Sequence, residues 1–120
     1  MSWNRRIGMW GEEQASQFLQ RKGFVILDRN FYTTQGEIDI IAKKGDDIYF
    51  IEVKTRSDKS LANSDAITYF KKNKLEKAKA VYCYKKNIGG VGIVLAGLIL
   101  KVDKINKTVK FNFFPFFDLN

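Results

Sequence analysis

The segment between Gly36 and Lys54 reads GEIDIIAKKGDDIYFIEVK, and its pattern decides the fold of the chain. Two runs rich in isoleucine, Glu37–Lys43 and Ile48–Lys54, flank a short polar stretch that contains a glycine. Runs of β-branched and aromatic residues on either side of a Gly/Asp loop are typical of a β-hairpin. The sequence therefore predicts two antiparallel strands joined by a turn over Lys44–Asp47.

The length of this loop also predicts which side chains face one another. If Lys43 lies opposite Ile48, the same register places Asp39 opposite Glu52. Directly opposed residues of an antiparallel ladder share a face, with Cβ atoms about 4.5–5.5 Å apart. Because side chains alternate with a period of two, Lys54 shares that face with Glu52. We therefore expect Asp39, Glu52 and Lys54 to lie together.

Two opposed carboxylates repel each other, and a divalent cation that binds both would remove this repulsion. The chain has no histidine and one cysteine, which leaves oxygen ligands and favours Mg²⁺ or Mn²⁺ over zinc. Lys54 could then orient an attacking water or stabilise charge on a phosphate. The alternative is a solvent-facing pair of acids neutralised by Lys54. The apolar residues that precede both acids on the same face favour burial instead.

Around this hairpin, the pattern predicts two helices and three further strands. The predicted helices are Asn4–Lys22, with Asn4 as its N-cap and Gly23 as its stop, and Ile67–Lys86; the other strands are Phe24–Tyr32, Gly92–Val102 and Thr108–Phe113. This order, α-β-β-β-α-β-β, predicts an α/β fold with a mixed β-sheet flanked by helices. A length of 120 residues suits a single domain over residues 1–120.

The first helix carries two adjacent acids that helical geometry separates. Glu12 precedes Leu19 by seven residues, so the two lie about 20° apart around the helix, whereas Glu13 projects from the far side. The apolar stripe of this helix contains Ile7, Trp10, Gly11, Ala15 and Phe18, and the small residues Gly11 and Ala15 on it would let the helix approach the sheet closely. Glu12 can therefore reach over the sheet, although an ordinary charge on the flank of a helix remains the alternative.

Twenty-one Lys and Arg against thirteen Asp and Glu give a formal net charge of +8. Such a balance suits a polyanionic partner, and ordinary solubility is the alternative. Arg56, Lys59, Lys71 and Lys72 lie near the expected site in sequence and are candidate nucleic-acid contacts, or else part of a solvated face. The longest apolar run, Val91–Leu100, is about half of what a membrane-spanning helix requires. We expect a cytoplasmic protein that does not enter the membrane.

Three motifs together resemble the YraN-like family, small bacterial proteins regarded as members of the PD-(D/E)XK nuclease superfamily. They are Gly11-Glu12, Gly36-Glu37-Ile38-Asp39-Ile40-Ile41-Ala42 and Ile51-Glu52-Val53-Lys54-Thr55-Arg56. The resemblance implies a restriction-endonuclease-like core akin to Holliday-junction resolvases. It also implies that Asp39 and Glu52 bind the metal, with Lys54 as the catalytic lysine. Glu12 is implied as an additional acid and the Val53 carbonyl as a backbone ligand.

The same resemblance leaves some positions open. Glu37 matches the family's Gly-Glu-Ile-Asp acid, yet it could simply pair with Lys54 or Arg56. Leu95–Leu98 replaces the Arg-Phe-Asp that relatives often carry, so the substrate groove is expected to differ. Junction-resolving relatives act as dimers, which implies a two-fold interface and a homodimer.

The function predicted is a metal-dependent endonuclease that hydrolyses phosphodiester bonds in DNA, either structure-selective for branched DNA or nonspecific. The first alternative is a noncatalytic nucleic-acid-binding module with the same fold. The second is an adaptor that acts through its aromatic C-terminus, where five phenylalanines lie between Phe111 and Phe117. For these rings we expect core packing or self-association, with base stacking as the alternative. Cys83 is expected to be a small core residue, because no histidine is present to activate it.

Overall fold

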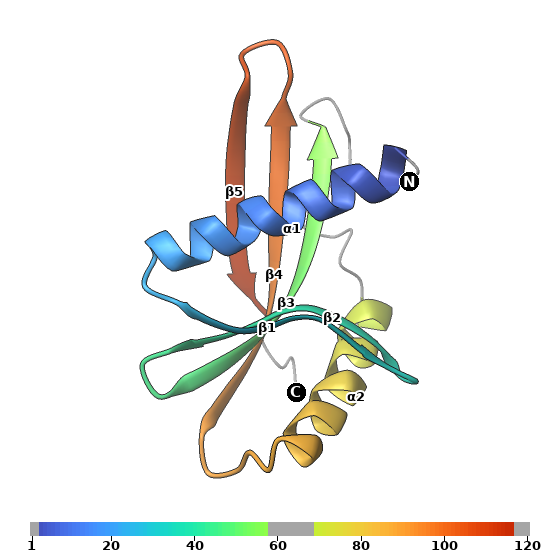
Figure 1. The fold of residues 1–120 in the computed structure, drawn as a ribbon, viewed down its shortest axis with the longest axis vertical. Coiled ribbons are helices and arrows are strands. Elements are labelled where there is room, and N and C mark those ends of the chain that lie inside the picture. Colours follow the sequence, from blue (N-terminus) through green and yellow to red (C-terminus); the bar gives the residue numbers. More distant parts are fainter. Residues whose placement is uncertain (1–2, 58–68, 117–120) are drawn as a thin grey trace.

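The helices and strands follow one another in the predicted order in the computed structural model, which describes residues 3–57 and 69–116 (Figure 1). They are α1 (Trp3–Arg21), β1 (Val25–Thr33), β2 (Gly36–Lys44), β3 (Asp47–Ser57), α2 (Tyr69–Lys85), β4 (Gly92–Asp103) and β5 (Thr108–Pro115). Helix α1 begins before Asn4, so the prediction of Asn4 as its N-cap is wrong. Gly23 ends the helix as predicted, with a φ of 92° and a hydrogen bond of 3.0 Å from the Phe24 N–H to the Leu19 carbonyl.

The five strands form one sheet in the order β1-β2-β3-β4-β5. Strands β3 and β4 are parallel, while the other three neighbouring pairs are antiparallel. A parallel pair needs a crossover connection, and α2 lies within the one between β3 and β4. The predicted mixed sheet with flanking helices is thereby confirmed.

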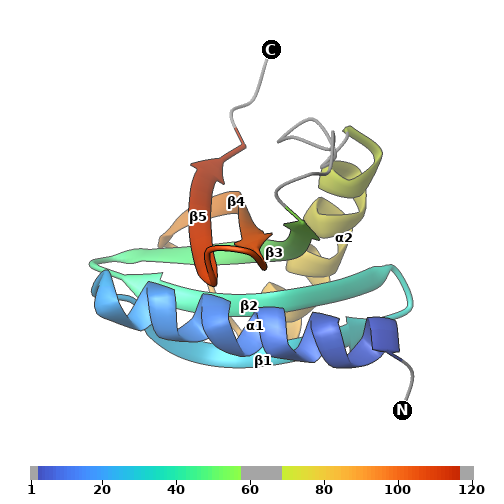
Figure 2. The same cartoon turned by 90° about the horizontal axis from the view of Figure 1, so that it is seen from above.

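Helices α1 and α2 pack on opposite faces of the sheet (Figure 2). Ala15 and Leu19 of α1 are fully buried in one core, together with residues of β2, β3 and β4. Leu75, Ala78 and Tyr82 of α2 form a second core with apolar residues of β2, β3 and β4. Neither described helix combines the length and apolar character that a membrane crossing needs. The two cores hold the helices at fixed positions relative to the strands between them.

The aromatic C-terminal strand packs mainly beneath α1. The Phe111 ring stacks on Phe18 with centroids 4.5 Å apart, and Phe113 meets Phe24 edge-on at 5.7 Å. Both are partly buried against the core under α1. Core packing is therefore confirmed for Phe111 and Phe113, while Phe117 lies outside the described residues. Cys83 is partly buried beside the core under α2, as expected.

Strands β2 and β3 pair only near their shared turn. The predicted register is confirmed there, with Lys43 opposite Ile48, and the pairing between the described residues ends at Ile40 and Ile51. Beyond that point β2 stays with β1, whereas β3 stays with β4, so the sheet forks (Figure 1). The predicted pairing of Asp39 with Glu52 is therefore wrong: the register between β2 and β3 stops one residue before this pair, and Glu52 keeps only its pairing with Gly97 of β4 on the other edge.

Candidate metal centre

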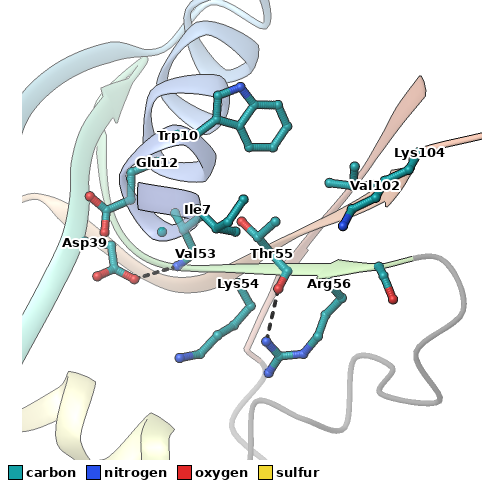
Figure 3. Close-up of a pocket in the computed structure, with 12 residues that line it drawn as sticks. Ile7, Trp10, Glu12, Asp39, Val53, Lys54, Thr55, Arg56, Val102 and Lys104 are labelled. Carbon is teal, nitrogen blue, oxygen red and sulfur yellow. Dashed lines mark hydrogen bonds between the residues drawn. The ribbon is translucent and has the colours of Figure 1, made fainter. Parts of the chain in front are cut away.

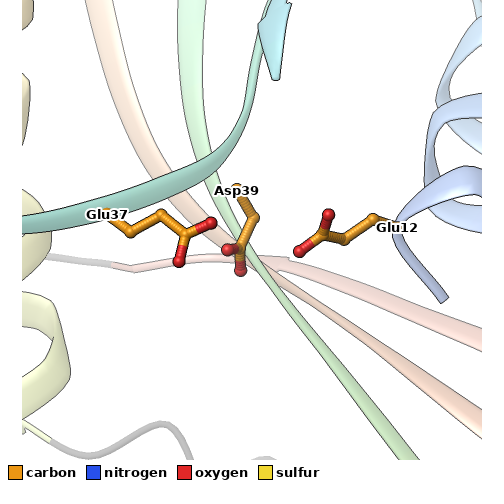
Figure 4. Close-up of side chains that lie close together, drawn as sticks. All are labelled: Glu12, Glu37 and Asp39. Atoms are coloured by element: carbon orange, nitrogen blue, oxygen red, sulfur yellow. The ribbon is translucent and has the colours of Figure 1, made fainter. Parts of the chain in front are cut away.

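Three carboxylates converge where β2 separates from β3. Glu12 comes from α1, and Glu37 and Asp39 come from β2. One carboxylate oxygen from each lies within 4.8 Å of the other two, and Figure 4 shows the three side chains pointing toward one another. We call this set the acidic cluster. It brings together two predicted site residues and Glu37, whose role the sequence left open.

Asp39 is at the centre of the acidic cluster because of a local change in β2. Ile38 and Ile41 face the core under α2, while Ile40 faces the core under α1, so the two-residue alternation is interrupted around Asp39. The Asp39 Oδ2 accepts a hydrogen bond of 2.8 Å from the Val53 N–H. This bond ties the carboxylate of one branch of the fork to the backbone of the other.

Helix α1 places Glu12 in the acidic cluster and Glu13 outside it, as the helical period predicts. Glu13 is exposed and accepts a 2.7 Å hydrogen bond from Arg29, whereas Glu12 is partly buried within the acidic cluster. The helix can approach β3 because residue 11 is glycine. A Cβ at Gly11 would collide with the hydroxyl of Thr55. The small residue thus sets the distance from which Glu12 reaches the cluster.

The carboxylates of the acidic cluster perturb each other's protonation. The pKa of Asp39 is raised to about 7: burial is the largest cause, the charges of Glu12, Glu37 and Glu52 add to the rise, and the Val53 hydrogen bond opposes it. Burial and the charge of Glu37 also raise the pKa of Glu12, while a hydrogen bond from Asn30 and the charge of Arg29 oppose the rise. Ionisation of the carboxyl groups is therefore disfavoured within the acidic cluster.

Glu52 and Lys54 lie beside the acidic cluster on the other branch of the fork. Their side chains form an ion pair with Nζ and Oε1 3.3 Å apart, and both are largely shielded from solvent. Glu52 is not among the three cluster acids, although its charge reaches Asp39. Its role as a metal ligand, like that of the Val53 carbonyl, stays a prediction. The structure shows Val53 at the site through its N–H.

A cleft of about 700 Å³ opens from the acidic cluster along β3 (Figure 3). Asp39 and Glu12 line one part of it, and the basic residues Lys54, Arg56 and Lys104 line other parts. The Lys54 and Arg56 side chains extend from β3 away from α1, whereas Lys104 lies on the same side as Trp10 (Figure 3). The Arg56 guanidinium donates to the Thr55 carbonyl at 3.2 Å, which holds it along the strand. Basic and acidic groups thus share one cleft.

The structure places only some of the four residues that were predicted to contact nucleic acid. Arg56 lines the cleft. Lys59 lies outside the described residues, and Lys71 and Lys72 are placed only by their backbone in α2. Trp10 and Lys104 are among the lining residues that were not predicted as site residues. The sequence pattern placed Trp10 on the buried stripe of α1, and Lys104 follows β4, far from the site motifs in sequence.

The acidic cluster fits a hard divalent cation. Carboxylate oxygens are the ligands that Mg²⁺ and Mn²⁺ prefer. Two oxygens on opposite sides of Mg²⁺ lie about 4.2 Å apart, so three donors that lie within 4.8 Å of one another approach the size of one coordination sphere. A cation would also offset the burial and the mutual repulsion that together raise the pKa of Asp39.

A mixed sheet with helices on both faces, and a fork that gathers three carboxylates beside a basic cleft, defines an α/β protein with a candidate divalent-cation site. The sequence profile described as "Uncharacterised protein family UPF0102" matches residues 11–109. The chain therefore belongs to the UPF0102 family, which confirms the membership expected from the YraN-like motifs.

Relatives of the family support this assignment over most of the chain. A UPF0102 protein of Alkaliphilus oremlandii is 39% identical over 110 residues, which cover 91% of this chain and 94% of the relative. A UPF0102 protein of Syntrophomonas wolfei is 46% identical over 80 residues, or 66% and 70% of the two chains. One from Dictyoglomus turgidum is 38% identical over 86 residues, or 71% and 73%.

Proposed function

We propose that this protein is a metal-dependent endonuclease of the PD-(D/E)XK superfamily that hydrolyses phosphodiester bonds in DNA. The observation that carries the proposal is the convergence of Glu12, Glu37 and Asp39 at the fork of the sheet, directly beside Lys54 in a cleft that also holds Arg56. Carboxylates that gather around a metal, next to a fixed cation, are the groups that phosphodiester hydrolysis requires.

In this proposal the acidic cluster holds Mg²⁺ or Mn²⁺, and Glu52 is an additional acid close to it. When bound, the metal would supply a polarised phosphate oxygen and a water of lowered pKa. Asp39 must be deprotonated to act as a ligand, and its hydrogen bond from the Val53 N–H fixes its orientation. The ion pair between Glu52 and Lys54 holds the lysine side chain beside the cluster.

The basic residues of the cleft support the proposal that it binds the DNA backbone. Lys54 lines the cleft together with Asp39, so its ammonium can stabilise negative charge that develops on a phosphate. Arg56 follows two residues later on β3, and Lys104 lines the cleft from the segment after β4, on the side of Trp10 and Val102 (Figure 3). These three cations, within a chain of net charge +8, support a polyanionic substrate.

The test of the proposed function is cleavage of single-stranded, nicked, branched and duplex DNA in the presence of Mg²⁺ or Mn²⁺. We expect the wild type to cut at least one of these substrates and to lose cleavage in a chelator. Asp39→Asn and Lys54→Ala should reduce the rate at least a hundredfold. Glu13→Gln is the matched control, because Glu13 is adjacent to Glu12 but pairs with Arg29 outside the cluster.

Two outcomes would count against the enzyme. Equal cleavage by the wild type and Asp39→Asn would identify a contaminating nuclease. Salt-sensitive DNA binding without cleavage under either metal, and unchanged in the Asp39 and Lys54 variants, would favour the noncatalytic binding module. Analytical ultracentrifugation of the same preparations would show whether the homodimer implied by the junction-resolving relatives forms.

A further inference from the structure

The cleft beside the acidic cluster has an apolar wall that the proposed chemistry does not use. Ile7 and Trp10 of α1 line it from one side and Val102 of β4 from another. Figure 3 shows the Trp10 ring extending from α1 on the side of Val102, whereas Glu12 extends from the same helix toward Asp39. One helix thus supplies an acid to one part of the cleft and an aromatic ring to another.

Trp10 is unusually accessible for the largest apolar side chain. It is 39% exposed, although it was predicted on the buried stripe of its helix. Because Trp10 forms part of the wall of the cleft, part of its indole surface is available to a bound molecule. Tryptophan and other aromatic rings in such positions bind nucleobases by stacking, and this contact tolerates any base because every base has an aromatic face.

The surrounding charges specify what kind of aromatic ligand would fit. Lys54, Arg56 and Lys104 line the same cleft as Trp10. Figure 3 shows Lys104 on the same side of β3 as Trp10, whereas the Lys54 and Arg56 side chains extend from the other side of β3. Each of the three would attract a phosphate of a strand that follows β3. A ligand that combines an aromatic face with phosphates on either side is a nucleotide within a strand. Free aromatic metabolites without phosphate would leave the three cations unused.

Stacking on Trp10 also requires that the base be unpaired. In a continuous duplex the faces of the bases are covered by their neighbours, and only their edges and the backbone are open to a protein. An unpaired base in a single strand, a gap or a flap presents its face.

We propose that Trp10 stacks on an unpaired base of the substrate, so that the site selects single-stranded, gapped or flapped DNA over continuous duplex. This inference rests on the proposed function for the nature of the ligand. Trp10 is then a specificity-determining residue. It contacts the base, while the acidic cluster and Lys54 act on the backbone.

The experiment measures binding in a chelator, where the DNA is not cut, so that it does not depend on catalysis. Fluorescein-labelled single-stranded, flapped and duplex DNA of equal length are titrated with the wild type, Trp10→Phe and Trp10→Leu. Phenylalanine keeps a smaller aromatic face, and leucine keeps apolar volume without one. Tyr84→Leu is the matched control, because Tyr84 is an 88% exposed aromatic residue on α2, on the opposite face of the sheet.

We expect Trp10→Leu to bind the single strand and the flap roughly 5- to 100-fold more weakly, in line with the loss of one stacked base. Duplex binding should stay within about twofold, as expected if the backbone contacts persist. Trp10→Phe should lie in between, and Tyr84→Leu should match the wild type. Affinities of Trp10→Leu that equal those of the wild type for every substrate, or an equal loss of affinity for single-stranded and duplex DNA, would overturn the proposal.

A second readout observes the indole directly. The chain has two tryptophans, so Trp10 is the sole fluorophore of its kind in a Trp3→Phe variant. A stacked base should quench its emission on addition of unlabelled single-stranded DNA, and duplex should leave the emission largely unchanged. The same emission with and without the single strand would overturn the proposal.

These results separate the inference from the proposed function. Cleavage that is present and unaltered in Trp10→Leu on all substrates would refute the role of Trp10 and leave the nuclease standing. Selective loss of single-strand binding in Trp10→Leu, in a protein that cuts nothing with either metal, would support the stacking site and refute the nuclease.

Discussion

At the scale of single residues, Asp39 connects the fold to the proposed chemistry. Its carboxylate is surrounded by Glu12 and Glu37, receives the Val53 N–H, and has a pKa raised to about 7. Near neutral pH, a proton and a cation therefore compete for the same oxygen atoms. Ionisation of Asp39 in this environment lowers the stability of the folded protein, and metal binding would offset this loss.

The raised pKa of Asp39 predicts a specific pH dependence of the protein's stability. The pKa is about 7 in the folded state and close to 4 in the unfolded chain, so the folded state holds more protons between these values. Stability therefore falls as the pH rises from about 4 through 7. Asp39→Asn keeps an oxygen for the Val53 N–H but cannot ionise. From pH 5 to pH 8, the unfolding free energy of the wild type should therefore fall by roughly 2–3 kcal/mol more than that of Asp39→Asn.

Urea unfolding in a chelator at pH 5 and pH 8 measures this difference. Glu13→Gln serves as the control, because Glu13 is exposed and its pKa is lowered by hydrogen bonds from Arg29 and Gln17. Parallel pH profiles for the wild type and Asp39→Asn would show that Asp39 is not held in an environment that disfavours its charge.

At the scale of elements, the site depends on how closely α1 approaches β3 and on where β2 leaves β3. The close approach is possible because residue 11 has no side chain to meet Thr55. The separation of the strands opens the fork in which the acidic cluster lies. Neither feature involves a catalytic group, yet both determine whether Glu12 meets Asp39.

Two glycines of α1 allow the close approach to be tested with a built-in control. An added Cβ at Gly11 would collide with Thr55, whereas one at Gly8 meets nothing within 4 Å. Gly8→Ala should stabilise the protein by up to about 1 kcal/mol through helix propensity. Gly11→Ala should instead destabilise it by about 1–2 kcal/mol.

Thermal and urea unfolding of the two variants measure the difference. The double variant Gly11→Ala/Thr55→Ala should recover part of the lost stability, because it removes the hydroxyl that the new methyl group meets. If Gly11→Ala proved as stable as Gly8→Ala, the contact between α1 and β3 would be looser than the structure describes.

At the scale of the whole molecule, the excess of positive charge should act on nucleic acid through the cleft. Binding should weaken as salt rises, with a slope that reports the number of phosphates contacted. Arg56→Ala and Lys104→Ala should each flatten the plot of log affinity against log salt by about one unit. Lys77→Ala should leave the slope unchanged, because Lys77 lies on α2, on the opposite face of the sheet.

Fluorescence anisotropy with a single-stranded oligonucleotide at several salt concentrations provides these slopes. Identical slopes for Lys77→Ala and the two cleft variants would mean that DNA binds through the diffuse charge of the surface. The cleft would then not be a specific binding site for DNA.

The sequence predicted most of the fold and about half of the site. Loop length sets pairing near a turn, so the register at Lys43 and Ile48 was predictable. The helical period separated Glu12 from Glu13 for a similar reason: both rules are local. The fork was not predictable from the hairpin alone, because it depends on β1 continuing with β2 and on β4 continuing with β3.

The residues that were missed depend on contacts between distant elements. The role of Glu37, which the sequence left open, becomes visible only when Glu12 of α1 packs beside Glu37 and Asp39 of β2. Trp10 fits the apolar stripe of α1 by its period, and only the packed structure shows it 39% exposed beside the cleft. Lys104 reaches the same cleft from the end of β4.

The measurement that tests the central claim most directly is Mn²⁺ binding, followed by isothermal titration calorimetry and by the paramagnetic signal of the free ion. The wild type should bind Mn²⁺ at neutral pH, and Mg²⁺ should compete for the site. Asp39→Asn and Glu12→Gln should each weaken binding at least tenfold. Glu13→Gln should bind as the wild type does. A wild-type protein that takes up no Mn²⁺, or a Glu12→Gln variant that binds it as well as Glu13→Gln, would contradict the claim that the fork of this sheet is a metal site.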